Sequence, residues 1–247
     1  MSGALLHVED LGVQFGGLKA LDGVSFSLAK GEIVGVIGPN GAGKTTLFNS
    51  LVGMQRPSRG RITFRGTLLR NIRPNRVTKA GMTKTFQNAA LFPEMSVLEN
   101  VITSALVRHD LSSAKRIATD TLARLGLTSI AGRDVSILTF PQKAMVELAR
   151  ALATEPQLLL LDEVMAALTP GEMDEVVSVI HQLRKDGITF LVVEHHMRAL
   201  MALSDRLLFL NFGRLVADGK PDEIISHPDV IRAYLGASGA KGEAAHA

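Results

Sequence analysis

The chain has 247 residues, of which 46% are hydrophobic, which suits one large domain with a core of its own. Its net charge of +3 is mildly basic and not concentrated enough to indicate a nucleic-acid-binding protein, so nucleic acid is not an expected partner. No apolar run approaches the roughly 18–20 residues that span a bilayer, and the first ten residues lack the features of a signal peptide. The absence of cysteine excludes disulfides and thiolate chemistry and fits a reducing cytosol.

Short strand-like runs alternate with turns in the N-terminal third of the chain. Residues 24–28 alternate between the two faces of a strand, and the apolar run 33–38 predicts a buried strand. Glycines follow, and apolar residues between Leu47 and Val52 then lie on one side of a predicted helix. Strand, glycine turn and helix are therefore predicted to form one unit.

A helical region comes next. The pattern from Val97 to about Arg124 is helical with few strand signals, and an amphipathic helix is predicted from Gln142 to Ala153. Residues from about 94 to 150 are therefore expected to form a helical sub-domain inserted into the fold.

Two more buried strands are predicted in the C-terminal half, at 158–161 and 188–193. Between them, Thr169 and Glu172 match a capping box, and Pro170 suits the first position of the helix that they begin.

The last part of the chain begins with a helix expected from about His196. Residues 206–211 and 214–219 then match a hairpin, and two short helices follow. The final ten residues, 238–247, are small and polar and are predicted to be disordered, so residues 1–237 are expected to form a single domain.

The predicted fold class is α/β, because buried strands that alternate with helices are typical of a largely parallel sheet covered on both faces. An antiparallel β region is expected near the N-terminus.

Basic residues are densest in one stretch of the chain. We interpret this stretch as a solvated face, with a face near anionic lipid headgroups as the alternative. Its residues are Arg65, Arg70, Arg73, Arg76, Lys79 and Lys84.

The strongest motif is GPNGAGKTT at 38–46, which matches GxxxxGK[ST] and lies between a predicted strand and a predicted helix. Its glycines let backbone N–H groups point at a phosphate, and the helix N-terminus adds a favourable dipole. Lys44 can reach the β- and γ-phosphates, and the Thr45 hydroxyl can bind Mg²⁺. The predicted phosphate-binding residues are Gly38, Pro39, Asn40, Gly41, Ala42, Gly43, Lys44, Thr45 and Thr46.

An acidic pair follows the strand at 158–161, at the strand end where parallel sheets bind ligands. Asp162 can hold Mg²⁺ through its water shell. Glu163 can orient or deprotonate the attacking water, as a general base. ATP and Mg²⁺ are therefore the expected cofactors.

The order of these motifs resembles the ATP-binding subunits of ABC transporters, which implies a P-loop NTPase core with a helical insertion. In that family an aromatic residue stacks on adenine, and Phe15 matches it. The family's glutamine loop matches Gln87, implying contact with Mg²⁺ or the catalytic water. Its switch histidine matches His195, which strand phase and spacing favour over His196.

The stretch LTFPQ at 138–142 occupies the place of the family's LSGGQ signature, which faces the γ-phosphate bound by the other subunit of a dimer. Leu138, Thr139 and Gln142 are therefore candidate nucleotide contacts. Phe140 and Pro141 replace both glycines, and Pro141 has no N–H to give the phosphate. The next loop often ends in Asp, where this chain has Thr169. These departures suggest a sound ATP half-site paired with a weakened signature, as in an asymmetric dimer.

More narrowly, FGGLKAL, TFQNAALFPEMSVLENV and GRLVADGKPDEIISHPDVIRAYLG resemble ATPases of branched-chain amino-acid importers and their relatives. The resemblance implies a peripheral ATPase on the cytoplasmic face of the inner membrane, working as a homodimer or with a paralogous subunit. Its other partners would be membrane permease subunits and, indirectly, an extracytoplasmic binding protein. The cargo stays open among branched-chain amino acids and related small organic solutes.

Three alternatives stay open. One is a regulatory module that binds ATP and barely hydrolyses it, for which the altered signature is the best evidence. Another is a soluble ABC ATPase of repair or translation, which the compact single domain disfavours. The third, a P-loop kinase or GTPase, leaves Gln87, the element at 138–150 and His195 unexplained together.

Overall fold

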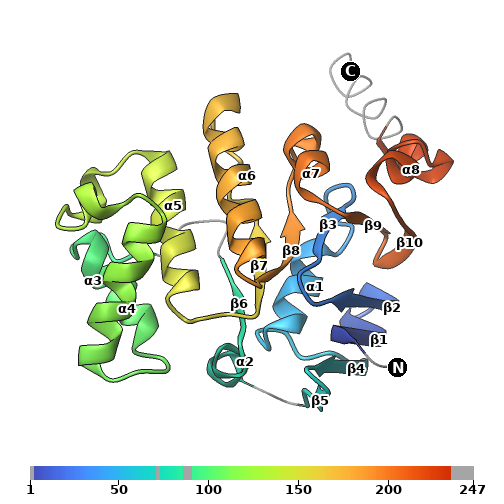
Figure 1. Ribbon diagram of the computed structural model, residues 1–247. Helices are drawn as coiled ribbons and strands as arrows, with labels where there is room; N and C mark the ends of the chain where they lie inside the picture. The colour runs from blue at the N-terminus through green and yellow to red at the C-terminus, as the bar shows by residue number, and fades with distance from the viewer. Residues whose placement is uncertain (1–2, 71–72, 86–90, 235–247) are drawn as a thin grey trace.

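The computed structural model describes residues 3–70, 73–85 and 91–234, which form two β-sheets and the helices around them (Figure 1). The predicted α/β class is confirmed. The tail predicted to be disordered, 238–247, lies outside the described residues, and the division into one domain with a sub-domain stays a prediction.

An antiparallel sheet comes from the N-terminal part of the chain, with the strand order β2-β1-β4-β5. The run 24–28 lies within the longer β2, which pairs with β1 along most of its length. The bounds are β1 Ala4–Phe15, β2 Leu18–Ala29, β4 Arg59–Phe64 and β5 Thr67–Leu68.

The central sheet has the order β10-β9-β3-β8-β7-β6, and all its neighbouring strands run parallel except the β9–β10 hairpin. The three predicted buried strands and the predicted hairpin are confirmed. The bounds are β3 Ile33–Ile37, β6 Met82–Lys84, β7 Leu158–Asp162, β8 Thr189–Val193, β9 Arg206–Asn211 and β10 Arg214–Gly219.

Alternation along the central strands divides the interior into two cores. Ile33 and Ile37 of β3 pack on the side of most helices, whereas Val34 and Val36 pack against α1 and the antiparallel sheet. Because both faces are covered, β3, β7 and β8 are buried at every residue.

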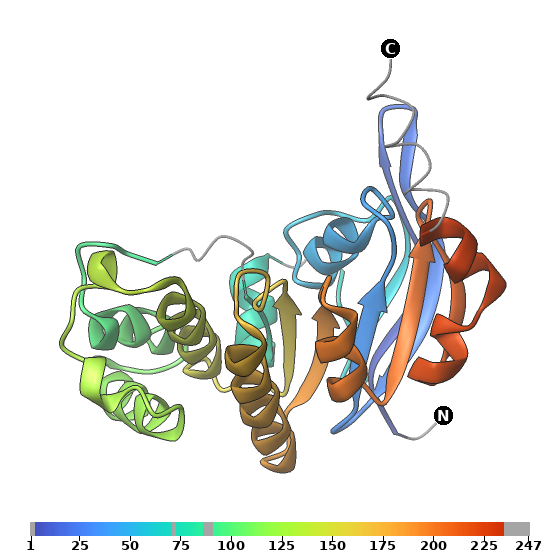
Figure 2. The same cartoon turned by 90° about the horizontal axis from the view of Figure 1, so that it is seen from above.

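Helices α3, α4 and α5 form a group on one side of the molecule, beyond the β6 edge of the sheet (Figures 1 and 2). The predicted helical region from Val97 to about Arg124 is confirmed and consists of two helices. The predicted helix at 142–153 begins earlier, at Phe140, so Pro141 is its second residue. The bounds are α1 Lys44–Leu51, α2 Pro74–Ala80, α3 Val97–Ala105, α4 Leu111–Arg124, α5 Phe140–Leu152, α6 Pro170–Lys185, α7 Met197–Leu203 and α8 Pro221–Ile225.

The start of α6 has the predicted cap. The Thr169 backbone N–H donates to Glu172 at 2.7 Å, and Pro170 is the first helical residue. After α8, a short helix at 228–234 continues to the end of the described residues. No helix among them is both long and apolar enough to span a bilayer.

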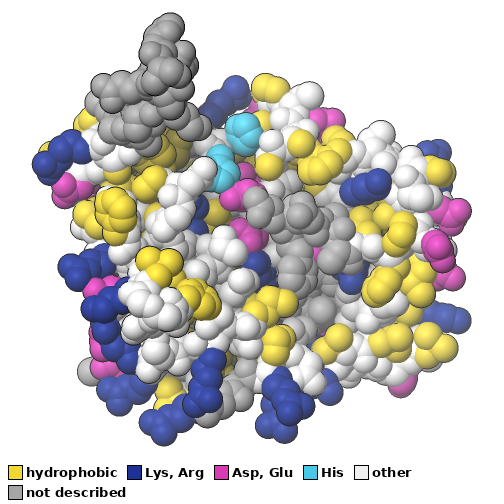
Figure 3. Space-filling view, turned by 180° about the vertical axis from the view of Figure 1, so that it is seen from behind, with side chains coloured by type: hydrophobic (Ala, Val, Ile, Leu, Met, Phe, Trp, Pro, Cys, Tyr) yellow, Lys and Arg dark blue, Asp and Glu magenta, His cyan; other side chains and the backbone are white. Residues whose placement is uncertain are grey.

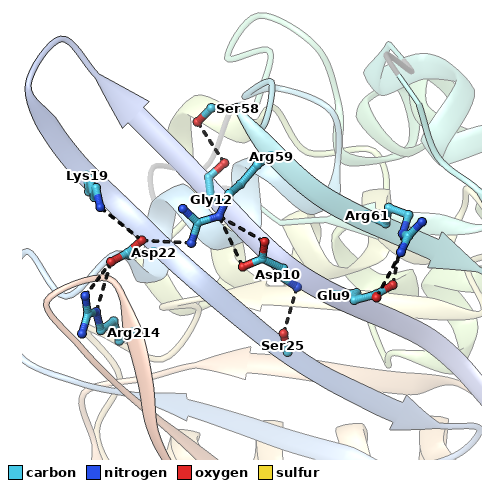
Figure 4. A network of polar contacts seen from close by, with 10 residues as sticks. All are labelled: Glu9, Asp10, Gly12, Lys19, Asp22, Ser25, Ser58, Arg59, Arg61 and Arg214. Carbon is cyan, nitrogen blue, oxygen red and sulfur yellow. Dashed lines mark hydrogen bonds and ion pairs between the residues drawn. The ribbon is translucent and has the colours of Figure 1, made fainter.

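A charge network joins the two sheets (Figure 4). Asp22 of β2 accepts hydrogen bonds from Arg214 of β10 at 2.7 Å and from Arg59 of β4 at 3.0 Å. These two guanidinium groups hold the pKa of the Asp22 carboxyl below its ordinary value. The network thereby ties the β9–β10 hairpin to the antiparallel sheet, next to the glycine motif.

Candidate active site

The glycine motif forms a loop between β3 and α1, as its spacing predicts. The Lys44 ammonium folds back over this loop and donates to the carbonyl oxygens of Gly38 at 2.7 Å and Pro39 at 3.1 Å. Burial lowers the pKa of Lys44, and the negative charges of Glu163 and Asp162 oppose this shift. The loop lysine and the acidic pair therefore share one electrostatic environment.

Two glycines of the loop are required by close backbone neighbours. A Cβ on Gly38 would lie 2.1 Å from the Leu210 carbonyl oxygen, and one on Gly43 would lie 2.6 Å from the Ala20 carbonyl oxygen. Gly43 also has a left-handed backbone, with φ of +104°. The loop is therefore clamped between β2 and the β9–β10 hairpin, whose Gly213 N–H donates to the Ala42 carbonyl at 3.0 Å.

A cavity of about 620 Å³ opens over the loop and is large enough for a nucleotide. The predicted aromatic residue Phe15 lines it and is 49% exposed. Phe212, at the tip of the β9–β10 hairpin, lines the same cavity and is 84% exposed. The sequence analysis missed Phe212, although an apolar ring beside the turn glycine of a predicted hairpin was a usable signal.

Glu163 reaches the same cavity from the end of β7. Its backbone is left-handed, with φ of +54°, a conformation that costs free energy in a non-glycine residue. His195 Nε2 lies 2.7 Å from Glu163 Oε1, and because a carboxylate only accepts hydrogen bonds, this contact places a proton on Nε2. The structure thus pairs His195 with the acidic residue, while His196 precedes α7 as its N-cap.

Asp162 is held from the neighbouring strand β6. Its Oδ2 lies 2.8 Å from Lys84 Nζ, and both side chains are almost fully buried, at 4% and 6% exposed. Lys84 Nζ also donates to Asn49 Oδ1 of α1 at 3.0 Å, and the Asp162 N–H donates to the Thr85 hydroxyl. Lys84, predicted to belong to a basic surface stretch, is therefore a buried partner of the acidic pair, because β6 runs beside β7.

Glu194 completes this cluster and was not predicted. It precedes His195 at the end of β8, is 3% exposed, and its Oε1 accepts a hydrogen bond from the Met165 N–H at 2.8 Å. Its Oε2 has no hydrogen-bond partner among the described residues. Burial raises the pKa of Glu194 to about 7, and the charges of Glu163 and Asp162 act in the same direction.

Residues 138–142 lie elsewhere and do not line the cavity over the glycine loop. Leu138 is buried in the core, and Gln142 Oε1 accepts a hydrogen bond from the Thr139 N–H at 3.1 Å, which caps α5. Phe140, by contrast, is 51% exposed. Gln87 lies outside the described residues, so its predicted role has no structural test here.

Comparison with known proteins identifies the family. The ABC transporter family matches residues 21–166. The chain belongs to that family. Residues 214–240 match a second family, described as branched-chain amino acid ATP-binding cassette transporter. The resemblance inferred from the motifs is thereby confirmed, and the chain is an ATPase subunit of the ABC type.

Relatives cover almost the whole cassette. The high-affinity branched-chain amino acid transport ATP-binding protein LivG of Salmonella typhimurium is 41% identical over 96% of this chain and 99% of its own. Its counterpart BraF of Pseudomonas aeruginosa is 36% identical over the same shares. A nucleotide-free ATP-binding cassette from an ABC transporter superposes with a TM-score of 0.87 at 30% identity, over 94% of this chain and 98% of the other.

Replacing Lys84 by methionine is expected to lower the free energy of unfolding of the nucleotide-free cassette by about 3–5 kcal/mol, because it leaves Asp162 buried without its counter-charge. Urea unfolding at neutral pH measures the loss. Adding Asp162→Asn to the Lys84→Met variant should restore part of the stability. A single variant as stable as the parent would show that the ion pair contributes little.

Glu194 should make stability depend on pH. Its pKa rises from 4.5 to about 7 on folding, so the folded state holds the proton more tightly. The resulting stabilisation is complete below pH 4.5 and is lost as the pH rises through 7. In Glu194→Gln this loss, on the order of 1–3 kcal/mol, should disappear. The test is to measure the free energy of unfolding of the parent and of Glu194→Gln between pH 5 and 8 and to compare how much each protein loses over that range. Parallel pH profiles of the two proteins would contradict the prediction.

Proposed function

We propose that this cassette is the ATP-hydrolysing subunit of an importer for branched-chain amino acids or related small organic solutes. The observation that carries the proposal is the single cavity in which the Lys44 loop faces Glu163, with His195 hydrogen-bonded to that carboxylate. A phosphate-binding loop beside a carboxylate and an imidazole provides the groups needed for attack of water on a γ-phosphate. The choice of branched-chain amino acids as the cargo is based on the names of the relatives.

Each residue then has a distinct task. The backbone N–H groups of residues 38–46 and the Lys44 ammonium bind the phosphates, and the ring of Phe15 stacks on the base. Glu163 activates the attacking water, and the His195 Nε2–H, which donates to Glu163 before nucleotide binds, would donate to the γ-phosphate once ATP is present. Because His195 already holds Glu163, both groups are positioned before nucleotide arrives. Gln87 keeps its predicted contact with the metal or the water.

Mg²⁺ is the expected companion of ATP, and the donors present suit it. The Thr45 hydroxyl and the Asp162 carboxylate are hard oxygen ligands, as Mg²⁺ requires. No group of three or more His, Cys, Asp or Glu among the described residues could hold a metal unaided, so phosphate oxygens and water must supply the remaining ligands. When bound, Mg²⁺ neutralises phosphate charge. Lys84 holds the Asp162 carboxylate in place for this role through their ion pair.

The cassette would work as a dimer in which each signature completes the other subunit's site. The separation of residues 138–142 from the chain's own phosphate cavity supports this arrangement. Leu138, Thr139 and Gln142 would serve the partner's nucleotide, while Pro141 withholds an N–H. A paralogous ATPase would supply the stronger signature. The pair would bind permease subunits on the cytoplasmic face of the inner membrane, with an extracytoplasmic binding protein delivering the cargo.

Glu163→Gln tests the catalytic assignment. The amide keeps the shape of the side chain but cannot accept the proton from water. ATP turnover in the assembled transporter should fall by about 10²–10⁴-fold while Mg·ATP affinity is retained. Turnover, nucleotide titration and uptake of labelled leucine are measured together. Undiminished turnover would remove Glu163 from its role, and uptake without ATP consumption would overturn the proposed function.

The double variant Phe140→Gly, Pro141→Gly tests the weakened signature. The double variant introduces two glycines and gives position 141 a backbone N–H. Because this N–H can donate a charge-assisted hydrogen bond to the partner's phosphate, turnover with the partner subunits should rise by about tenfold. Phe92→Gly, which changes another exposed phenylalanine outside the signature, is the control. If the double variant is no faster than the parent, the idea of an asymmetric pair fails.

The altered signature also favours a second candidate, a subunit that binds ATP and barely hydrolyses it. Phe140 is exposed at the helix start where a nucleotide of the partner would approach, and can crowd it. Single-turnover hydrolysis in the assembled complex separates the two candidates, because a regulatory subunit would leave its ATP intact.

A further inference from the structure

Positive charge is concentrated in one stretch of this cassette, although the net charge of the whole chain is small. Ten of the 27 basic residues and none of the 24 acidic residues lie between Glu32 and Glu94. This stretch therefore carries +10, whereas the rest of the chain, with 17 basic and 24 acidic residues, carries −7. An asymmetry of this size within one domain produces a directional electrostatic field.

The structure separates the basic residues of this stretch into paired and unpaired ones. Lys44 and Lys84 are buried, and Arg59 and Arg61 form ion pairs with acidic residues of β1 and β2. Six others are exposed and have no acidic partner among the described residues. We call them the cationic face: Arg56, Arg65, Arg70, Arg73, Arg76 and Lys79.

These six side chains come from neighbouring elements, α2 and the turns around β4 and β5. In the space-filling view, Lys and Arg gather along the lower edge of the molecule, where Figure 1 places α2, β4 and β5 (Figure 3). Met54 and Leu68 are exposed beside them, at 48% and 36%. The cationic face thus combines positive charge with a few apolar side chains, a composition typical of membrane-surface contacts.

A cavity of about 430 Å³ lies within the cationic face. Arg56 and Arg73 line it together with Leu69 and Val77, and the prolines that follow the two arginines also contribute to its wall. Guanidinium binds phosphate through two parallel hydrogen bonds. The cavity is not part of the ATP site, because it lies at the C-terminal end of α1, a helix whose eight residues span about 12 Å from the phosphate loop, and it shares no lining residue with the cavity over that loop.

We propose that the cationic face rests on the anionic phospholipid headgroups of the membrane beside which the ATPase works. The inference rests on the proposed function, because that function places the ATPase beside a membrane. Nucleic acid fits the face less well, because Phe64, the one aromatic residue between positions 54 and 80, is buried and cannot stack on bases. A groove between α2 and α5 shares Pro74 with the cavity of the cationic face. A permease segment bound in that groove would therefore lie next to the lipid-facing surface.

The test is flotation of the purified full-length chain with vesicles, without nucleotide. Vesicles of equal parts phosphatidylglycerol and phosphatidylcholine should carry the chain, and pure phosphatidylcholine vesicles should not. Raising the salt from about 0.1 to 1 M, which shortens the Debye length from ~10 to ~3 Å, should release it. The variant Arg70→Gln, Arg73→Gln, Arg76→Gln, Lys79→Gln should bind at least about tenfold more weakly.

A matched control removes the same number of exposed, unpaired charges elsewhere: Lys30→Gln, Lys115→Gln, Arg116→Gln, Arg133→Gln. It should float like the parent, and both variants should bind ATP as the parent does, which shows that they fold. Equal binding to both vesicle types, equal loss in both variants, or tighter binding to duplex DNA than to anionic vesicles would each overturn the inference. A chain that floats but does not hydrolyse ATP would overturn only the proposed function.

Discussion

The phosphate loop depends on the close approach of backbone from two distant parts of the chain. The carbonyl oxygens of Ala20 and Leu210 leave no room for a side chain at Gly43 and Gly38, and the Gly213 N–H binds the loop directly. A phosphate-binding loop without this clamp would have to be ordered by the nucleotide itself, at an entropic cost. Here the cost is met on folding, through the network around Asp22 that holds the hairpin against the antiparallel sheet. Nucleotide binding therefore draws on the stability of both sheets.

The carboxyl ends of β7 and β8 gather three acidic side chains beside a single nucleotide cavity. Three ionised carboxylates at this edge would repel one another and the triphosphate. The structure distributes the charge in three different ways. Asp162 is neutralised by the buried Lys84, Glu163 is held by His195, and Glu194 has a pKa raised to about 7, so that it carries a proton for part of the neutral range. Under the proposed function, this arrangement would leave Asp162 for the metal and Glu163 for the attacking water.

Much of this fold follows from local sequence. Strands β3, β7 and β8, the α6 cap and the β9–β10 hairpin have periodicity or turn chemistry that predicts them, and the glycine motif lies where a strand and a helix predict a loop. Local sequence could not show which strands lie side by side in the sheet. Nothing around Lys84 indicates burial, because its partner Asp162 lies 78 positions away and reaches it only through the pairing of β6 with β7. Glu194 was missed for the same reason, because its role depends on what the topology places opposite it, whereas Phe212 had a local signal in the predicted hairpin turn.

The signature region shows why an ATPase can lose donor groups without losing its fold. Gln142 accepts the hydrogen bond of Thr139 within the first turn of α5, and a proline early in a helix removes only an N–H that has no partner inside that helix. The glycines that the family carries there are therefore not needed for the helix to begin. Phe140 and Pro141 therefore leave the start of α5 intact, and under the proposed function their effect would fall on a phosphate held by another subunit. Because residues 138–142 do not line the chain's own cavity, changes at these two positions leave its phosphate loop intact, and in the proposed dimer one cassette could therefore specialise.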